Sequence, residues 1–81
     1  MTLTVLFFAM LRDVVKHEKI TLETPSECSL EDLFGQLASR YPDLEEWRDH
    51  VRCAVNCQYV PVHTKLRDGD EVCFIPPVSG G

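Results

Sequence analysis

The hydrophobic pattern at the start of the chain predicts a β-strand. Residues 2–9 read TLTVLFFA and are rich in the β-branched and aromatic types that favour strands. Because successive side chains of a strand point to opposite faces, the odd-numbered residues share one face and the even-numbered residues, including Phe8, share the other. Both faces are largely apolar, which predicts a central strand or a strand whose outer face meets a partner.

A polar connection is expected from Arg12 to Glu18, before a second strand from Lys19 to Glu23. A helix is predicted next, with Ser29 as its N-cap and Asp32 three residues later, close to a capping box. Apolar residues then recur at helical spacing as far as Tyr41 and form one stripe. The following Pro42 ends the helix, because proline disfavours the helical conformation in the residue before it.

The second half of the chain predicts short strands joined by turns. Its expected elements are a loose helical turn within Leu44–His50, a strand over Val51–Val55, a turn over Asn56–Gln58, a short strand at Tyr59 and Val60, a turn over Asp68–Asp70 and a last strand over Glu71–Ile75.

The order of these elements predicts an α+β fold. The first two strands are joined too closely for a crossover helix, so they form a hairpin. The single main helix then carries the chain across one face of the sheet, which implies at least one parallel pair of strands. This is the β-grasp arrangement, a mixed sheet packed on one main helix. We expect the domain to span residues 1–75 and an extended, flexible C-terminal tail to span residues 76–81.

Composition narrows the possible functions. A chain of 81 residues, 44% apolar and 26% charged, forms one small globular domain with no room to enclose both a substrate and a cofactor. Its net charge of −5 opposes binding to nucleic acid or to an anionic membrane surface and suits a basic protein partner. The apolar run Val5–Leu11 is far shorter than the roughly 20 residues of a membrane helix, and it lacks the flanks of a signal peptide. We therefore expect a cytoplasmic protein.

The cysteines do not have the spacing of a metal site. Zinc sites usually contain closely spaced pairs, and a ferredoxin cluster needs several thiolates in one loop. Cys53 and Cys57 are separated by three residues, and Cys28 and Cys73 are isolated. We expect reduced thiols that fill space, with Cys57 exposed in a turn and open to oxidation, and no bound metal or cofactor. Neither a nucleophile elbow nor a glycine-rich phosphate loop is present.

The C-terminal tail carries the clearest candidate chemistry. Pro76 and Pro77 follow the last predicted strand and keep the exit extended, because proline cannot rejoin a sheet ladder. Gly80 and Gly81 lack Cβ atoms, so the terminal carboxylate can pass along a narrow slot in another protein. A carboxylate must first be activated, most simply by adenylation with ATP. Sulfide would then give a thiocarboxylate, whereas a lysine would give an amide.

Four stretches carry a resemblance to a known family. They are VLFFAMLRD (5–13), AVNCQYV (54–60), LRDGDEV (66–72) and IPPVSGG (75–81). In order, spacing and total length, the chain resembles the small, sulfur-carrying subunits of molybdopterin synthase, which are ubiquitin-like. The match runs from the first strand to the last residue, and the last two motifs are the specific ones. The cysteines at positions 53, 57 and 73 are not part of the recognised motif, and no role is assigned to them.

The resemblance implies a reaction sequence at the C-terminus. An ATP-dependent enzyme related to ubiquitin-activating enzymes would adenylate Gly81, and a sulfur donor would convert it to a thiocarboxylate. The tail, with Gly80 before its end, would then enter the large synthase subunit and sulfurate cyclic pyranopterin monophosphate. Catalytic acid–base groups would belong to the large subunit. The assembly would be a heterotetramer with one small subunit at each end.

The remaining candidate residues would bind the partner protein. Phe8, Ile75 and Tyr59 are candidates for an outward apolar patch, with ordinary packing of the second sheet face as the alternative. Arg12 is placed to reach a partner or to be solvated. The other candidates are the tail residues Pro76, Pro77, Val78 and Ser79.

Three other functions fit the same sequence. One is a sulfur carrier for another product, such as the thiamine thiazole, and another is a modifier that joins Gly81 to lysines of target proteins. The third is a β-grasp interaction module whose tail has no chemical role.

Overall fold

The structure, a computed structural model, describes residues 1–77 and contains three helices and five strands in that range. In chain order the elements are β1 (Thr2–Phe7), α1 (Met10–Val15), β2 (Lys19–Glu23), α2 (Leu30–Arg40), the 3-10 helix η1 (Pro42–His50), β3 (Arg52–Val55), β4 (Gln58–Tyr59) and β5 (Glu71–Ile75).

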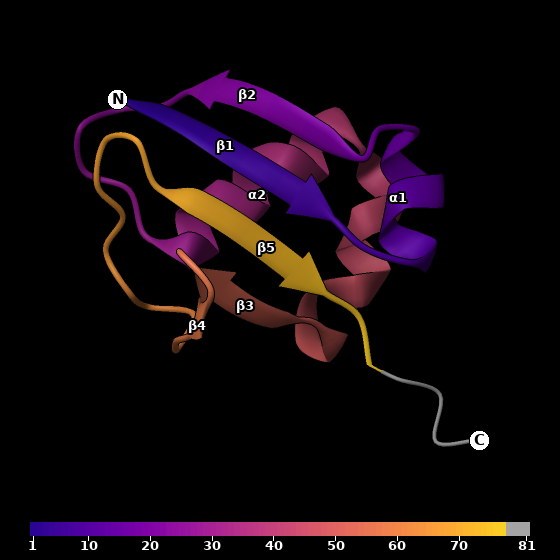
Figure 1. Ribbon diagram of the computed structural model, residues 1–81. Coiled ribbons are helices and arrows are strands. Elements are labelled where there is room, and N and C mark those ends of the chain that lie inside the picture. The colour runs from indigo at the N-terminus through magenta and orange to yellow at the C-terminus, as the bar shows by residue number, and fades with distance from the viewer. Residues whose placement is uncertain (78–81) are drawn as a thin grey trace.

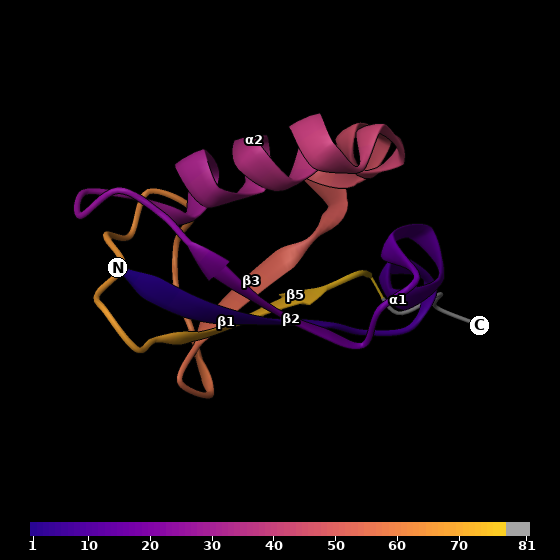
Figure 2. The same cartoon turned by 90° about the horizontal axis from the view of Figure 1, so that it is seen from above.

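The strands form one mixed sheet in the order β2-β1-β5-β3-β4. β1 pairs antiparallel with β2, as the predicted hairpin requires, and parallel with β5. β3 pairs antiparallel with both β5 and β4. Helix α2 lies across one face of this sheet (Figures 1 and 2). These features confirm the α+β, β-grasp prediction, including its parallel pair.

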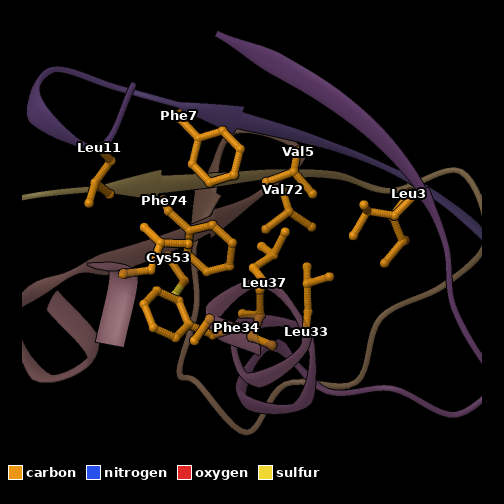
Figure 3. Close-up of a cluster of buried hydrophobic side chains, with 14 of the residues drawn as sticks. Leu3, Val5, Phe7, Leu11, Leu33, Phe34, Leu37, Cys53, Val72 and Phe74 are labelled. Carbon is orange, nitrogen blue, oxygen red and sulfur yellow. The ribbon is translucent and has the colours of Figure 1, made fainter. Parts of the chain in front are cut away.

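The core lies between α2 and the sheet. Along β1 the odd-numbered side chains are buried and the even-numbered ones are partly exposed, as predicted. Phe74 of β5 is 1% exposed and lies at the centre, with its ring edge-on to Phe34 of α2 at 5.3 Å and stacked on Phe7 at 6.3 Å between ring centroids. Figure 3 shows the three rings gathered between the helix and the strands. Aromatic pairs in these geometries add to the free energy gained from burial.

The predicted start of α2 is confirmed at the level of hydrogen bonds. The Asp32 N–H donates to Ser29 Oγ at 3.2 Å, and the Ser29 N–H donates to Asp32 Oδ2 at 3.1 Å. This reciprocal capping box satisfies two N–H groups of the helix end. The bonds to Ser29 lower the pKa of the Asp32 carboxyl, because they favour its charged form.

The predicted polar connection from Arg12 to Glu18 is wrong in its first part, because α1 occupies Met10–Val15. This six-residue helix has no side-chain N-cap, so its local sequence gives little indication of it. It forms because Leu11 and Val15, one turn apart, are both buried in the core. Similarly, η1 extends over Pro42–His50, longer than the loose turn expected within Leu44–His50. The bounds of β3 and β4 each differ from the prediction by one residue.

The turn between β3 and β4 is a two-residue hairpin loop. Asn56 and Cys57 have φ angles of 50° and 72°, the left-handed conformation that such a loop requires at both positions. The Asn56 side chain also ties the hairpin to the start of β5. Its Nδ2 donates to Asp70 Oδ1, and its Oδ1 accepts from the Glu71 N–H, both at 3.0 Å. The predicted turn at Asp68–Asp70 is likewise present, with Gly69 at a φ of 85°.

Among residues 1–77, no helix is long and apolar enough to cross a membrane.

Candidate functional site

The last strand leaves the domain from the middle of the sheet. β5 is hydrogen-bonded to β1 on one side and to β3 on the other, so both of its edges are held. Pro76 is buried against the domain and Pro77 is exposed. The chain beyond this point therefore starts from a rigid base. The predicted residues Val78, Ser79, Gly80 and Gly81 lie outside the described residues.

The face of the sheet opposite α2 carries an apolar area beside this exit. In the register of the sheet, Leu6 lies next to Cys73, Cys73 next to Ala54, and Ala54 next to Tyr59. One row further along, Phe8 continues β1 beside Ile75. We call the outer-face patch the set Leu6, Phe8, Ala54, Tyr59, Cys73 and Ile75, in which Ala54 and Cys73 are buried and the other four are at least partly exposed.

The structure places the three predicted patch residues on this same face. Phe8 is 44% exposed and Tyr59 is 66% exposed, whereas Ile75 is half-buried. The strand of Ile75, β5, lies between β1, which Phe8 continues, and β4, which carries Tyr59. Large aromatic side chains exposed on one face of a sheet are typical of protein interaction sites. Their role in binding a partner stays a prediction. Sequence reasoning missed Leu6, Ala54 and Cys73, because only the strand order brings them into the same row.

The backbone after β1 fixes the position of Phe8. Ala9 has a φ of 50°, a value that residues with a Cβ rarely adopt, and it turns the chain from β1 into α1. The Phe8 carbonyl accepts a hydrogen bond from the Leu11 N–H at 3.1 Å. Phe8 is thus held at a corner between two elements rather than on a free loop.

Two arginines are candidates for the rim of the site. Arg12 is exposed on α1, and its guanidinium lies 3.8 Å from Glu18 Oε1, a surface pair that contributes little to stability. Arg52 stands opposite Ile75 in the register, and its guanidinium lies 5.9 Å from the centroid of the Tyr59 ring. Arg52 was not predicted from the sequence. It places a positive charge beside the patch although the whole chain carries a charge of −5.

The acidic side chains of the Asp68–Asp70 turn are engaged within the domain. Asp68 Oδ1 accepts from the Thr2 N–H at 2.7 Å, and Asp70 Oδ2 accepts from the Arg67 N–H at 2.8 Å. These bonds hold the turn against the first strand and within itself.

Three of the four cysteines are buried and protonated. Cys28, Cys53 and Cys73 are buried, as expected for space-filling thiols, and Cys57 is exposed in its turn. Burial raises the pKa of all three buried thiols, that of Cys53 to about 11, so they are protonated at neutral pH. Within residues 1–77, no three His, Cys, Asp or Glu side chains are grouped to hold a metal ion.

Comparison with known proteins places the chain in a family. The model of the ThiS family matches residues 5–81. The chain belongs to the ThiS family. Among curated ThiS-like relatives, the molybdopterin synthase sulfur carrier subunit of Chlamydomonas reinhardtii is 39% identical and covers 100% of both chains. The protein of the same name from Mycobacterium tuberculosis is 38% identical over 95% of this chain and 94% of its own length.

Solved structures agree with the observed fold. SAMP1 from Haloferax volcanii superimposes with a TM-score of 0.88, at 24% identity and with full coverage of both chains, which supports the ubiquitin-like fold. A complex of subunits 1 and 2 of the molybdopterin-converting factor from Helicobacter pylori contains a chain with a TM-score of 0.70 and 28% identity, again with full coverage of both chains.

Proposed function

We propose that this chain is the sulfur carrier subunit of a molybdopterin synthase. The observation that carries the proposal is the full-length similarity to a sulfur carrier subunit of that enzyme, at 39% identity. The similarity includes the C-terminal segment with Gly80 and Gly81, since the family model extends to residue 81. The outer-face patch and the rigid exit of β5 support it, because a carrier needs a docking surface close to its reactive end.

The proposed chemistry begins with activation of the Gly81 carboxylate. A carboxylate oxygen attacks the α-phosphorus of ATP in the activating enzyme and releases pyrophosphate, which leaves an acyl-adenylate. A persulfide or hydrosulfide sulfur from the donor then attacks the acyl carbon and displaces AMP. For a persulfide donor, a thiol must also reduce the remaining S–S bond. The product is a thiocarboxylate at Gly81.

Sulfur transfer takes place in the large subunit. The thiocarboxylate sulfur bonds to a carbon of cyclic pyranopterin monophosphate and displaces an oxygen substituent from that carbon, and water then cleaves the acyl carbon–sulfur bond. This hydrolysis leaves sulfur on the pterin and restores the Gly81 carboxylate. Because a dithiolene holds two sulfur atoms, two charged carriers are consumed for each product. The chain itself binds no cofactor in this scheme, and ATP belongs to the activating enzyme.

We propose that the outer-face patch docks on the large subunit, in a heterotetramer with one small subunit at each end. A related chain is found in a complex of subunits 1 and 2 of a molybdopterin-converting factor. Phe8 and Tyr59 are the exposed aromatic anchors, and Arg52 supplies a charge at the rim.

Replacement of Phe8 by Asp is expected to weaken binding to the large subunit by about 100-fold, because it places a charge at an apolar contact. Isothermal titration calorimetry with the purified large subunit measures the effect. Thr21→Asp is the matched control, since it adds the same charge on the same face, on the edge strand β2 and outside the patch. Equal affinities of the two variants would contradict docking through the patch.

Intact-mass measurement tests the proposed function. After incubation with the activating enzyme, ATP and a sulfur donor, we expect one oxygen to be replaced by sulfur, and fragmentation to locate the change at Gly81. Addition of the large subunit and the pterin precursor should restore the carboxylate and form molybdopterin. A thiocarboxylate that gives no molybdopterin would indicate a carrier for another product. A tail that stays a carboxylate would indicate an interaction module, and amide-linked conjugates in cells would indicate a modifier.

A further inference from the structure

One edge of the sheet has an unpaired and regular row of backbone groups. β2 is the outermost strand, and its inner side pairs with β1. The Glu18 carbonyl accepts from the Phe7 N–H, and the Thr24 N–H donates to the Met1 carbonyl. The backbone N–H and C=O groups of the even-numbered residues of β2 therefore point toward β1. By strand alternation, the N–H and C=O groups of Lys19, Thr21 and Glu23 point away from the sheet. In the part of the chain that the structure describes, no strand pairs with this side.

The sequence of β2 is complementary to itself when it is reversed about Thr21. Lys19 and Glu23 lie at equal distances from Thr21 with opposite charges, and Ile20 and Leu22 are its apolar neighbours on either side. We propose that β2 pairs antiparallel with β2 of a second copy, with the two-fold axis between the two Thr21 residues. The two five-stranded sheets then become one continuous sheet.

The backbone geometry fits this register. With the axis at Thr21, Lys19 lies opposite Glu23 of the copy, and each of the three outward-pointing positions exchanges both an N–H and a C=O bond with its counterpart. A shift of two residues in either direction places Lys19 opposite Thr21 or opposite Pro25. Either shift loses both Lys19–Glu23 pairs, and Pro25 has no N–H to donate.

The side chains favour the same pairing. Lys19 and Glu23 are exposed on the outer face, and Lys19 makes no ion pair with any residue of the described range. Glu23 accepts the Thr2 hydroxyl through Oε1, which leaves Oε2 for a lysine of the copy. Opposite charges directly across an antiparallel pair are attractive, and like charges there are repulsive.

On the other face, the pairing covers a surface of mixed polarity. A groove of about 500 Å³ runs between β2 and α2, lined in part by Leu22 and Glu23 on the strand and Leu37 and Arg40 on the helix. Ile20 of the copy lies opposite Leu22 and enters the mouth of this groove. Ile20 is itself half-buried and packs on the core, so pairing completes its burial.

Pairing uses the outer edge of β2, which carries no residue of the outer-face patch. Tyr59 and Ile75 lie on strands away from the two-fold axis, whereas Leu6 of the patch lies on β1 beside Lys19. The pairing therefore does not rest on the sulfur carrier function and can be tested without any partner protein. A five-residue edge is small for an interface, so the expected dimer is weak and is measured at subunit concentrations up to about 1 mM.

Charge reversal tests the pairing in the full-length chain by sedimentation equilibrium. Lys19→Glu and Glu23→Lys should each weaken the dimer about tenfold, because each places two like-charged pairs across the axis. The double variant with both substitutions should restore wild-type association. Arg52→Glu makes the same change of charge as Lys19→Glu at the far side of the sheet and should leave association unchanged. No dimer at 1 mM, equal loss from Arg52→Glu, or no rescue in the double variant would each overturn the proposal.

Amide hydrogen exchange gives an independent measurement that does not depend on any substitution. As the concentration rises, exchange at the N–H groups of Lys19, Thr21 and Glu23 should slow at least about fivefold in the paired fraction, since these groups become bonded. The amides of Ile20 and Leu22 already face β1 and should change less. Equal slowing at all five positions, or none, would contradict the register.

Discussion

Removal of Gly80 and Gly81 is expected to abolish molybdopterin formation, with a loss of about a thousandfold or more in the reconstituted reaction. The terminal carboxyl carbon is the proposed site of both adenylation and sulfur attachment. The shortened chain ends in a carboxylate at Ser79, but its reach is shorter by about 7 Å. Removal of Gly81 alone leaves a carboxylate, but it shortens the reach by about 3.5 Å. Since a misplacement of about 1 Å costs on the order of 100-fold, this variant should also be nearly inactive.

Two controls separate the chemical defect from a structural one. The shortened chains should unfold at the same urea concentration as the wild type, because they lack no residue of β5 or the core. They should also still bind the large subunit through the outer-face patch. A shortened chain that forms molybdopterin at a rate within tenfold of the wild type would disprove the role of the terminus.

Replacement of Phe74 by Ala is expected to lower the free energy of unfolding by about 3–5 kcal/mol. Phe74 is 1% exposed on the central strand and contacts the rings of Phe7 and Phe34, so its loss leaves a cavity between sheet and helix. A domain of this size has a total stability of about 5 kcal/mol. The variant should therefore keep only about 0–2 kcal/mol of stability and be up to about half unfolded without denaturant, and urea denaturation followed by circular dichroism measures the shift.

Phe8→Ala is the matched control for Phe74→Ala. It removes the same ring from the other face of the sheet, where Phe8 is 44% exposed, and should cost about 1 kcal/mol or less. Phe74→Leu conserves most of the volume and should cost about 1.5 kcal/mol. A similar loss of stability from Phe8→Ala and Phe74→Ala would mean that the two faces of the sheet are equally buried, against the structure.

The sequence alone determined the elements that have strong local patterns. β1 and β5 are runs of β-branched and aromatic residues, and α2 has an apolar stripe with a capping box at Ser29. The proposed C-terminal chemistry also rests on the sequence, because it depends on residue types and their order at the end of the chain. The motif from Ile75 to Gly81 predicted both the extended exit and the reactive end.

Only the tertiary structure decided what depends on contacts between distant segments. Helix α1 is too short to form by its own propensity and exists because Leu11 and Val15 are buried. The outer-face patch exists because the strand order places β5 between β1 and β3, which brings Phe8, Ile75 and Tyr59 to one face. The same order makes β2 an edge, so its self-complementary sequence is free to pair. Local pattern fixes which faces of a strand are apolar, whereas the neighbours of each strand follow from packing across the whole chain.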